Sequence, residues 1–276
     1  MKKKKVGIAL GGGAARGMAH IGVLERLEKE NIPIDIIAGT SAGAIVGALF
    51  AKGMSAAEIK REVLDIDLLK RWKLIDVGLP KTGFIGGKKL MAMLQSYIGD
   101  IDFSELKMPF TCTATDILSG EEVVIDKGPV IEGVRASIAV PIVFAACERN
   151  GRFLVDGGLV DQVPVDLVRD MGADIVIAVS VSPRMPNVNK RVTIDEAPSD
   201  NKGKTKKPNM YTIMMNHMGI INSQTTTASL ERADIVIEPR LTGISFTDFK
   251  KAEQCITEGD FAAIDAMLEI KRLLAQ

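Results

Sequence analysis

The stretch VGIALGGGAARGMAHIGVLERLEKENIPIDIIAGTSAG, residues 6–43, decides the fold of this chain. Its first aliphatic run, Val6 to Leu10, has the length and composition of a buried strand. A glycine turn and a helical pattern follow, and a second aliphatic run covers Ile34 to Ala38. Ser41 then opens a second helical pattern that ends near Gly53, a residue suited to a helix C-terminus. Strands that alternate with helices in this way predict a parallel sheet with helices on both faces.

The rest of the chain continues the pattern. The segment Ser55-Ala56-Ala57-Glu58 matches a capping box and predicts the start of a third helix. Further strands are expected at Phe110 to Thr115, Val123 to Ile125, Phe153 to Val155, Ile175 to Val181 and Ile235 to Ile237, and a closing helix at Phe261 to Leu274. We therefore expect a single α/β domain over residues 1–276, a three-layer α/β/α sandwich with a mainly parallel central sheet.

One segment departs from this regular pattern. Residues Pro183 to Pro208 are rich in proline, lysine, asparagine and aspartate and lack helical or strand periodicity, so they predict a long flexible loop. The loop is either a surface insertion or a lid over a site. Met210, Ile213, Met214 and Met218 follow at helical spacings, which suits core packing or an acyl-binding groove.

Composition excludes several classes of function. Lysine plus arginine and aspartate plus glutamate both number 35, so no chain-wide field would recruit nucleic acid. The three cysteines are far apart and suit free thiols in a reducing compartment, and neither they nor the two histidines have metal-ligand spacing. No run reaches the roughly 20 apolar residues of a membrane span. We expect a cytoplasmic protein that needs no metal or organic cofactor. The oligomeric state stays open, and the basic start, Met1 to Lys5, is a solvated strand entry or a contact for anionic lipid.

The segment Gly39-Thr40-Ser41-Ala42-Gly43 is the candidate nucleophile site. A serine hydroxyl becomes a useful nucleophile when a tight turn exposes it beside a base. The G-x-S-x-G spacing between a strand and a helix supplies such a turn, because the flanking glycines let the helix pack closely against the strand. The alternative is a tight turn with a purely structural role.

The glycine turn at residues 11–17 has three interpretations. A phosphate-binding loop is excluded, because Met18 and Ala19 stand where that motif needs lysine and serine or threonine. A dinucleotide fingerprint is disfavoured, because Asp35 lies near the beginning of the second strand and not at its end. An oxyanion hole fits, because consecutive small residues present backbone N–H groups beside the serine strand.

The spacing of the motifs does not identify the residue that would act as the base for the serine. His20 lies one turn into the first helix and suits packing or hydrogen bonding, and His217 lies in the methionine-rich stretch, where histidine is usually structural. Asp156 follows a short strand and precedes two glycines, Gly157 and Gly158, which permit close approach of other backbone. A turn aspartate is the structural alternative.

Taken together, these motifs resemble the patatin-like phospholipase family. The family pattern has a glycine-rich oxyanion segment ending in Arg-Gly or Lys-Gly, a G-x-S-x-G nucleophile and a downstream D-G-[AG]. They correspond here to Gly12-Gly13-Ala14-Ala15-Arg16-Gly17, Gly39 to Gly43 and Asp156-Gly157-Gly158. Similarity also runs through residues 19–24, 136–141 and 172–174. The joint occurrence of three spaced motifs is far more specific than any one of them.

The resemblance implies a Ser41–Asp156 dyad without histidine, with the N–H groups of Gly12, Gly13 and Ala14 as oxyanion donors. Two positions depart from the family pattern. Ala14 replaces a frequent third glycine, which an alanine can do if its backbone is not left-handed. Gln162 stands where relatives commonly carry asparagine before x-Pro. Under this resemblance, Arg16 either holds the oxyanion loop in place or binds a phosphate headgroup.

The expected function is hydrolysis of lipid acyl esters. Phospholipase A, lysophospholipase and short-chain carboxylesterase activities all stay open, with contact at a membrane surface as part of the first two. A non-catalytic lipid-binding or regulatory protein of the same fold is the competing interpretation. A nucleotide-binding α/β protein is disfavoured by Asp35 and by the missing phosphate-loop lysine.

Overall fold

The computed structural model describes residues 4–65, 88–141, 143–182 and 226–276, together with residues 213, 216, 217 and 220. The expected loop from Pro183 to Pro208, and Met210, Met214 and Met218 beyond it, lie outside the described residues.

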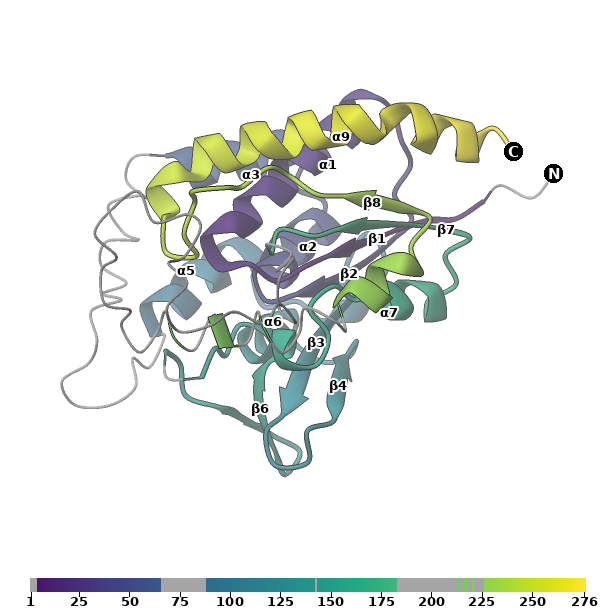
Figure 1. Cartoon of the computed structure of the whole chain (residues 1–276). Helices are drawn as coiled ribbons and strands as arrows, with labels where there is room; N and C mark the ends of the chain where they lie inside the picture. Colours follow the sequence, from purple (N-terminus) through teal and green to yellow (C-terminus); the bar gives the residue numbers. More distant parts are fainter. Residues whose placement is uncertain are drawn as a thin grey trace, which may run out of the picture.

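A single sheet forms the centre of the molecule (Figure 1). Its strands are β1 (Val6–Leu10), β2 (Ile36–Thr40), β3 (Phe110–Asp116), β4 (Glu122–Ile125), β5 (Cys147–Arg149), β6 (Arg152–Asp156), β7 (Ile175–Val179) and β8 (Ile235–Ile237). They lie in the order β5-β6-β3-β2-β1-β7-β8, with β4 paired beside β3. The pairs β3–β2, β2–β1, β1–β7 and β7–β8 are parallel. Strands β4 and β6 each pair antiparallel with β3, and β5 pairs antiparallel with β6. The expected mainly parallel sheet is confirmed.

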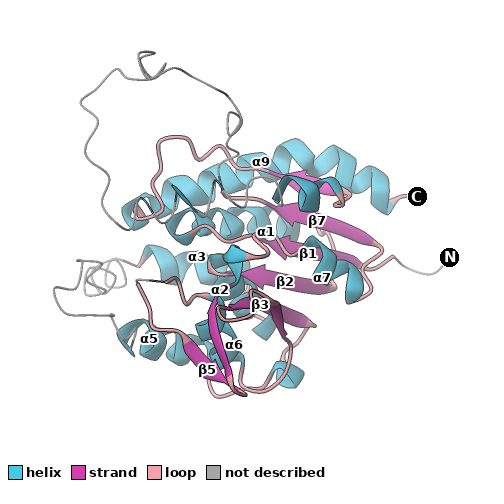
Figure 2. Ribbon diagram, turned by 60° about the horizontal axis from the view of Figure 1, so that its bottom comes forward, coloured by secondary structure: helices cyan, strands magenta, loops and turns pink. Residues whose placement is uncertain are grey.

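Helices enclose the sheet (Figure 2). They are α1 (Ala19–Lys29), α2 (Ala42–Lys52), α3 (Ala56–Leu64), α5 (Lys88–Ile98), α6 (Val130–Ser137), α7 (Val165–Asp170) and α9 (Ala252–Leu274), with short 3-10 turns η1 (Ala14–Met18), η2 (Phe103–Glu105), η3 (Gly157–Leu159) and η4 (Phe249–Lys251). Alternate residues of β1 separate two cores: Ile8 packs in the core with α1, α2 and α9, and Ala9 in the core with α7. The three-layer α/β/α expectation is confirmed.

The strand and helix boundaries differ from the expected ones in places. Strand β2 begins at Ile36 instead of Ile34, because Asp35 is occupied in holding the start of β1: its Oδ2 accepts the Val6 N–H at 2.8 Å. Helix α9 begins at Ala252, well before the expected Phe261. Strand β5 and helices α5, α6 and α7 were not anticipated.

Two glycines let α1 and α9 pack closely against each other. A Cβ on Gly22 of α1 would collide with the Ile256 carbonyl oxygen, and a Cβ on Gly259 of α9 would collide with the Ala19 carbonyl oxygen. The two helices therefore cross with their backbones in contact. Gly259 thus lies inside α9 as a packing residue.

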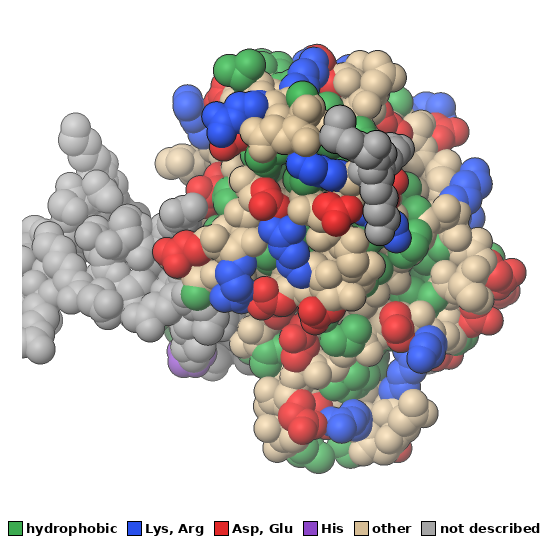
Figure 3. All heavy atoms as spheres, turned by 90° about the vertical axis from the view of Figure 1, so that its right-hand side faces the viewer, with side chains coloured by type: hydrophobic (Ala, Val, Ile, Leu, Met, Phe, Trp, Pro, Cys, Tyr) green, Lys and Arg blue, Asp and Glu red, His purple; other side chains and the backbone are tan. Residues whose placement is uncertain are grey.

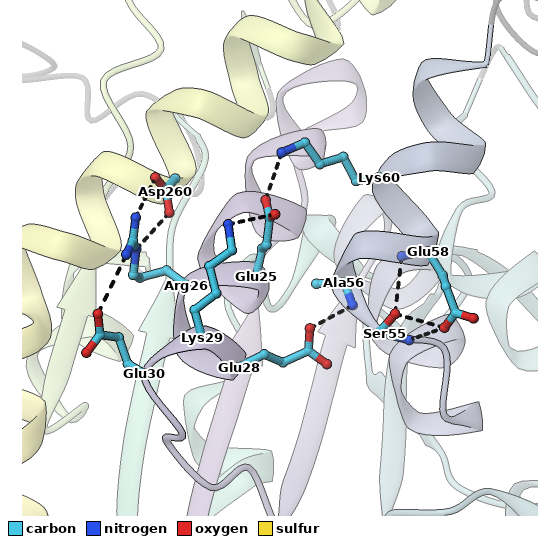
Figure 4. A network of polar contacts seen from close by, with 10 residues as sticks. All are labelled: Glu25, Arg26, Glu28, Lys29, Glu30, Ser55, Ala56, Glu58, Lys60 and Asp260. Carbon is cyan, nitrogen blue, oxygen red and sulfur yellow. Dashed lines mark hydrogen bonds and ion pairs between the residues drawn. The ribbon is translucent and has the colours of Figure 1, made fainter.

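Ion pairs anchor α1 between α3 and α9, and a capping box starts α3 (Figure 4). Arg26 of α1 donates to both carboxylate oxygens of Asp260 at 2.9 and 3.0 Å. Lys60 of α3 pairs with Glu25 at 2.9 Å, and the expected capping box at Ser55 and Glu58 is formed. Because α1 directly follows η1, these contacts fix the end of the glycine turn.

Acidic and basic side chains are interspersed on the face drawn in Figure 3, in keeping with the zero net charge. The described part of the chain contains no helix with the length and hydrophobicity needed to cross a membrane.

Candidate active site

The register of the sheet brings Ser41 and Asp156 to the same edge. Thr40, the last residue of β2, pairs with Thr113 of β3, so Ser41 follows beside Ala114. Strand β4 pairs with Cys112 to Thr115 along one edge of β3, so β6, whose last residue Asp156 pairs with Ala114, continues along the edge that β2 occupies. Ser41 and Asp156 therefore meet on the same edge of β3, where β2 and β6 end.

Ser41 adopts a strained elbow. Its φ of 52° and ψ of −117° lie in a region that side-chain-bearing residues rarely occupy. The Ser41 N–H donates to the Ser137 Oγ at 2.9 Å. A Cβ on Gly43 would collide with the Leu10 carbonyl oxygen, and one on Gly39 would lie 2.6 Å from the Gly43 carbonyl oxygen. The two glycines of the motif are thus required by contact between β2, α2 and the end of β1.

Asp156 is 2% exposed and is held at several points. Its Oδ1 accepts the Gly158 N–H at 2.8 Å, and its backbone carbonyl accepts the Thr115 hydroxyl at 2.9 Å. A Cβ on Gly157 would collide with the Thr113 carbonyl oxygen, so this turn also needs a residue without a side chain.

The second carboxylate oxygen of Asp156 is free to act. Within the described residues, Oδ2 is buried and has no hydrogen-bond partner of normal geometry. Burial raises the pKa of Asp156 to about 6, and hydrogen bonding from the Ser41 hydroxyl and the Gly158 N–H opposes that rise. The Ser41 hydroxyl therefore lies close to this carboxylate, although no hydrogen bond of normal geometry joins it to Oδ2. An apo site with a loose hydrogen bond between nucleophile and base is common.

The glycine turn lies against the serine. A Cβ on Gly12 would lie 3.3 Å from the Ser41 Cβ. The Gly12 N–H, however, already donates to the Gln162 carbonyl oxygen at 3.0 Å, so it has no capacity left for an oxyanion. The N–H groups of Gly13 and Ala14 precede the first turn of η1, where amides have no acceptor inside the helix. Gly13 and Ala14 therefore remain as the candidate oxyanion donors.

Ala14 has a left-handed backbone, with φ of 47°. The condition under which alanine replaces glycine without strain is therefore not met, and the chain holds Ala14 in a conformation that glycine would adopt more easily. Ala14 also lines the cavity that opens at Ser41.

Gln162 holds the glycine turn in place. Its side-chain Nε2 donates to the Gly12 carbonyl oxygen at 2.6 Å and to the Ser182 Oγ at 2.8 Å. Ser182 in turn donates to the same Gly12 oxygen at 3.0 Å. The residue that departs from the family pattern thus supports the loop directly.

The histidines have other roles. His20 is fully buried and contacts the Gly11 carbonyl oxygen through Nε2 at 2.7 Å, and because a carbonyl only accepts, Nε2 carries the proton. Burial lowers the pKa of His20 to about 4, so the ring is neutral at physiological pH. His217 is exposed. His20 is a hydrogen-bonding residue of the glycine turn, as its position in the sequence suggested.

Arg16 docks a distant loop onto η1. Its Nε donates to the Ile244 carbonyl oxygen at 2.7 Å, and its guanidinium lies 4.4 Å from the centre of the Phe246 ring. Burial lowers the pKa of Arg16. These contacts favour the loop-holding role of Arg16 over contact with a headgroup.

Two supporting residues were not assigned from the sequence. Ser137 accepts a hydrogen bond from the Ser41 N–H, and Ser182 completes the support of Gly12. Ser137 lies in the stretch 136–141 that carried part of the resemblance, which was the available signal for it.

Residues 8–169, more than half of the chain, match the family model for patatin-like phospholipase. The chain belongs to the patatin-like phospholipase family. Over 180 residues it is 37% identical to an uncharacterized NTE family protein of Mycobacterium tuberculosis, a match that covers 64% of this chain and 49% of that protein. It is 32% identical over 179 residues to lysophospholipase NTE1 of Saccharomyces cerevisiae, covering 64% of this chain and 11% of the yeast protein.

The fold is shared with a solved structure. VipD from Legionella pneumophila superposes with a TM-score of 0.53 at 14% identity, covering 95% of this chain and 66% of that one. This patatin-like chain spans about half the length of the mycobacterial relative.

Ala14→Gly tests the strain in the oxyanion segment. Glycine adopts a φ of 47° without the steric cost that alanine meets, so the variant should be more stable by about 0.5–1 kcal/mol in urea unfolding. The matched control is Ala15→Gly, one residue into η1, which should be destabilised by about 1 kcal/mol. Equal losses of stability in both variants would contradict the strain at Ala14.

Asp156→Asn removes the buried charge and keeps an oxygen for the Gly158 N–H. Because burial raises the pKa of Asp156 from 3.8 to about 6, the folded protein keeps a proton that the unfolded chain releases. Stability therefore falls as the pH rises from about 4 to about 6. We expect the variant to exceed the natural protein in stability at pH 7.5 by about 1–3 kcal/mol, with the gain vanishing near pH 4.

Urea unfolding at both pH values measures this difference. Asp126→Asn makes the same chemical change at an exposed position and should alter stability by less than about 0.5 kcal/mol. An Asp156→Asn protein that is less stable than the natural one at pH 7.5 would show that the contacts of the carboxylate outweigh the cost of burying it.

Proposed function

We propose that this chain hydrolyses lipid acyl esters through a Ser41–Asp156 dyad and an acyl-enzyme. The observation that carries the proposal is the buried Asp156 carboxylate, which lies beside Ser41 where β2 and β6 end on one edge of β3, with Oδ2 uncommitted. Membership of the patatin-like phospholipase family supports a lipid ester as the substrate, and the yeast relative is named a lysophospholipase.

In the first half-reaction Asp156 takes the hydroxyl proton of Ser41 as Oγ attacks the ester carbonyl carbon. The carbonyl oxygen becomes an oxyanion, and the Gly13 and Ala14 N–H groups donate to it. The C–O bond to the alcohol then breaks, Asp156 returns its proton to the departing alkoxide, and the acyl group stays on Ser41. A single oxyanion donor contributes about 3 kcal/mol to such a step.

In the second half-reaction Asp156 takes a proton from water, and the hydroxide attacks the acyl carbon. The bond to Ser41 Oγ breaks, the proton passes from Asp156 to Oγ, and the fatty acid leaves. The pKa of Asp156, raised by burial to about 6, suits both tasks, because the group is ionised at neutral pH yet binds a proton more readily than an ordinary aspartate.

The natural substrate is a phospholipid or a lysophospholipid under this proposal, and the protein contacts the membrane surface. A short-chain carboxylesterase is the alternative. The two differ in whether turnover requires a lipid headgroup and a long acyl chain or is satisfied by a small soluble ester.

Labelling by a fluorophosphonate, followed by assay of fatty-acid release, tests the proposal. The folded natural protein should be labelled at Ser41 and should release fatty acid from a panel of phospholipids, lysophospholipids and short esters. Ser41→Ala should lose labelling and reduce release by about 10³-fold or more. Ser104→Ala, the same change in an exposed residue of η2, should leave both unchanged.

Release of fatty acid by Ser41→Ala at the natural rate would remove Ser41 from the mechanism. Folded natural protein that binds acyl esters of every length yet shows neither labelling nor release would point to a non-catalytic lipid-binding protein instead.

A further inference from the structure

Helix α9 carries an exposed apolar stripe. The helix runs along the outside of the molecule (Figure 1), and its residues Phe261, Ile264 and Leu268 are 55%, 43% and 84% exposed. At about 100° per residue, these three side chains lie within about 60° of one another around the helix axis. They point away from Ala263 and Ile270, through which α9 packs into the core. Neither the fold nor the proposed reaction uses this stripe.

The spacing of the stripe fits a second helix. Single exposed apolar residues are normal on a protein surface, whereas a contiguous group marks a site of interaction. The three residues follow one another at intervals of three and four, which is the spacing of the seam between two packed helices. Their exposed fractions show that no described part of the chain covers them.

Two charged residues flank Leu268 on one side. Asp265 lies one turn before it and Arg272 one turn after it, and both are exposed. Each lies about 50° to the same side of Leu268 around the helix axis. They are seven residues apart, whereas side chains that pair along a helix are three or four apart. Within the described residues, neither side chain has an ion-pair partner.

A second copy of α9 supplies a partner for both charges. When two copies of a helix pack antiparallel about a two-fold axis, each flank meets the same flank of the other copy. With the axis at Leu268, Asp265 lies about 4.5 Å from the axis along its helix, and Arg272 of the second copy lies about 6 Å from it in the same direction. The symmetry repeats this pair, so the contact contains two ion pairs around two adjoining leucines.

The charges favour a second copy over a lipid surface. A helix that lies on a membrane carries mostly lysine and arginine beside its apolar face. Beside this stripe, the acidic residues Asp265 and Glu269 lie on the same flank as Arg272. Acidic and basic positions on one flank suit a self-complementary contact.

We propose that two copies of this chain associate through α9, antiparallel about a two-fold axis at Leu268, with Asp265 of each copy paired to Arg272 of the other. The ion pairs set the orientation, and the apolar side chains supply the attraction. The contact is at the small end of specific interfaces, so the dimer dissociates on dilution. It requires no turnover and therefore does not depend on the proposed function.

Sedimentation equilibrium of the natural protein tests for the dimer. The average mass should rise from that of one chain toward twice that value as the concentration increases from about 1 to about 500 μM. Leu268→Gln should raise the dissociation constant about 100-fold, because each copy loses a buried leucine. Leu118→Gln is the matched control at a residue that is 76% exposed on the turn between β3 and β4, and it should leave the constant unchanged.

Charge reversal tests the orientation. Asp265→Arg places arginine opposite arginine, and Arg272→Asp places aspartate opposite aspartate, so each variant alone should associate at least about tenfold more weakly. An equimolar mixture of the two variants should regain the natural dissociation constant, because every contact between unlike variants joins opposite charges.

Natural protein that is monomeric throughout, a dimer that survives Leu268→Gln, or a mixture that associates no better than its components would overturn the proposal. Monomeric protein that binds phosphatidylcholine vesicles, and loses that binding in Leu268→Gln, would assign the stripe to a lipid surface instead.

Discussion

Burial of the Asp156 carboxyl beside Ser41 is the constraint on which the rest of this site depends. A buried carboxylate is costly unless hydrogen bonds compensate it, and here one oxygen is satisfied by the Gly158 N–H while the other is left for the serine. The fold meets this cost by placing the aspartate at the end of β6, where its backbone is held by Ala139 and Thr115. Those contacts fix the backbone of Asp156, and the hydrogen bond from the Gly158 N–H holds its side chain.

The backbone around Ser41 is also closely packed. The elbow at Ser41 brings α2 so close to the end of β1 that the Gly43 position has no room for a Cβ. That closeness is useful, because it sets the glycine turn against the nucleophile and lets Ala14 and Ser41 line one cavity. The turn is then fixed by residues from three other parts of the chain: His20 at Gly11, Gln162 at Gly12, and the loop around Phe246 at Ala15 and Arg16. The proposed donors are thus held by contacts that do not include the substrate.

The alternating pattern of residues 6–43 was sufficient to predict the parallel core, and strand ends next to glycines were sufficient to identify Ser41 and Asp156 as candidates. The support of the turn could not be predicted in this way. That Gln162 occupies the Gly12 N–H is a consequence of contact between segments about 150 residues apart, and the left-handed backbone of Ala14 has no signal in the sequence pattern. The part of α9 that precedes Phe261 contains Gly259, whose place against the Ala19 carbonyl oxygen depends on the crossing with α1 and has no signal in the local sequence.

The pH dependence of the reaction of Ser41 with a fluorophosphonate tests the dyad most directly. The second-order rate of labelling should rise with pH through a single ionisation near 6, the pKa to which burial raises Asp156, and should be the same in His217→Asn protein. A rate that shows no ionisation near this pH, or an ionisation that disappears in His217→Asn protein, would contradict a base made by Asp156 alone.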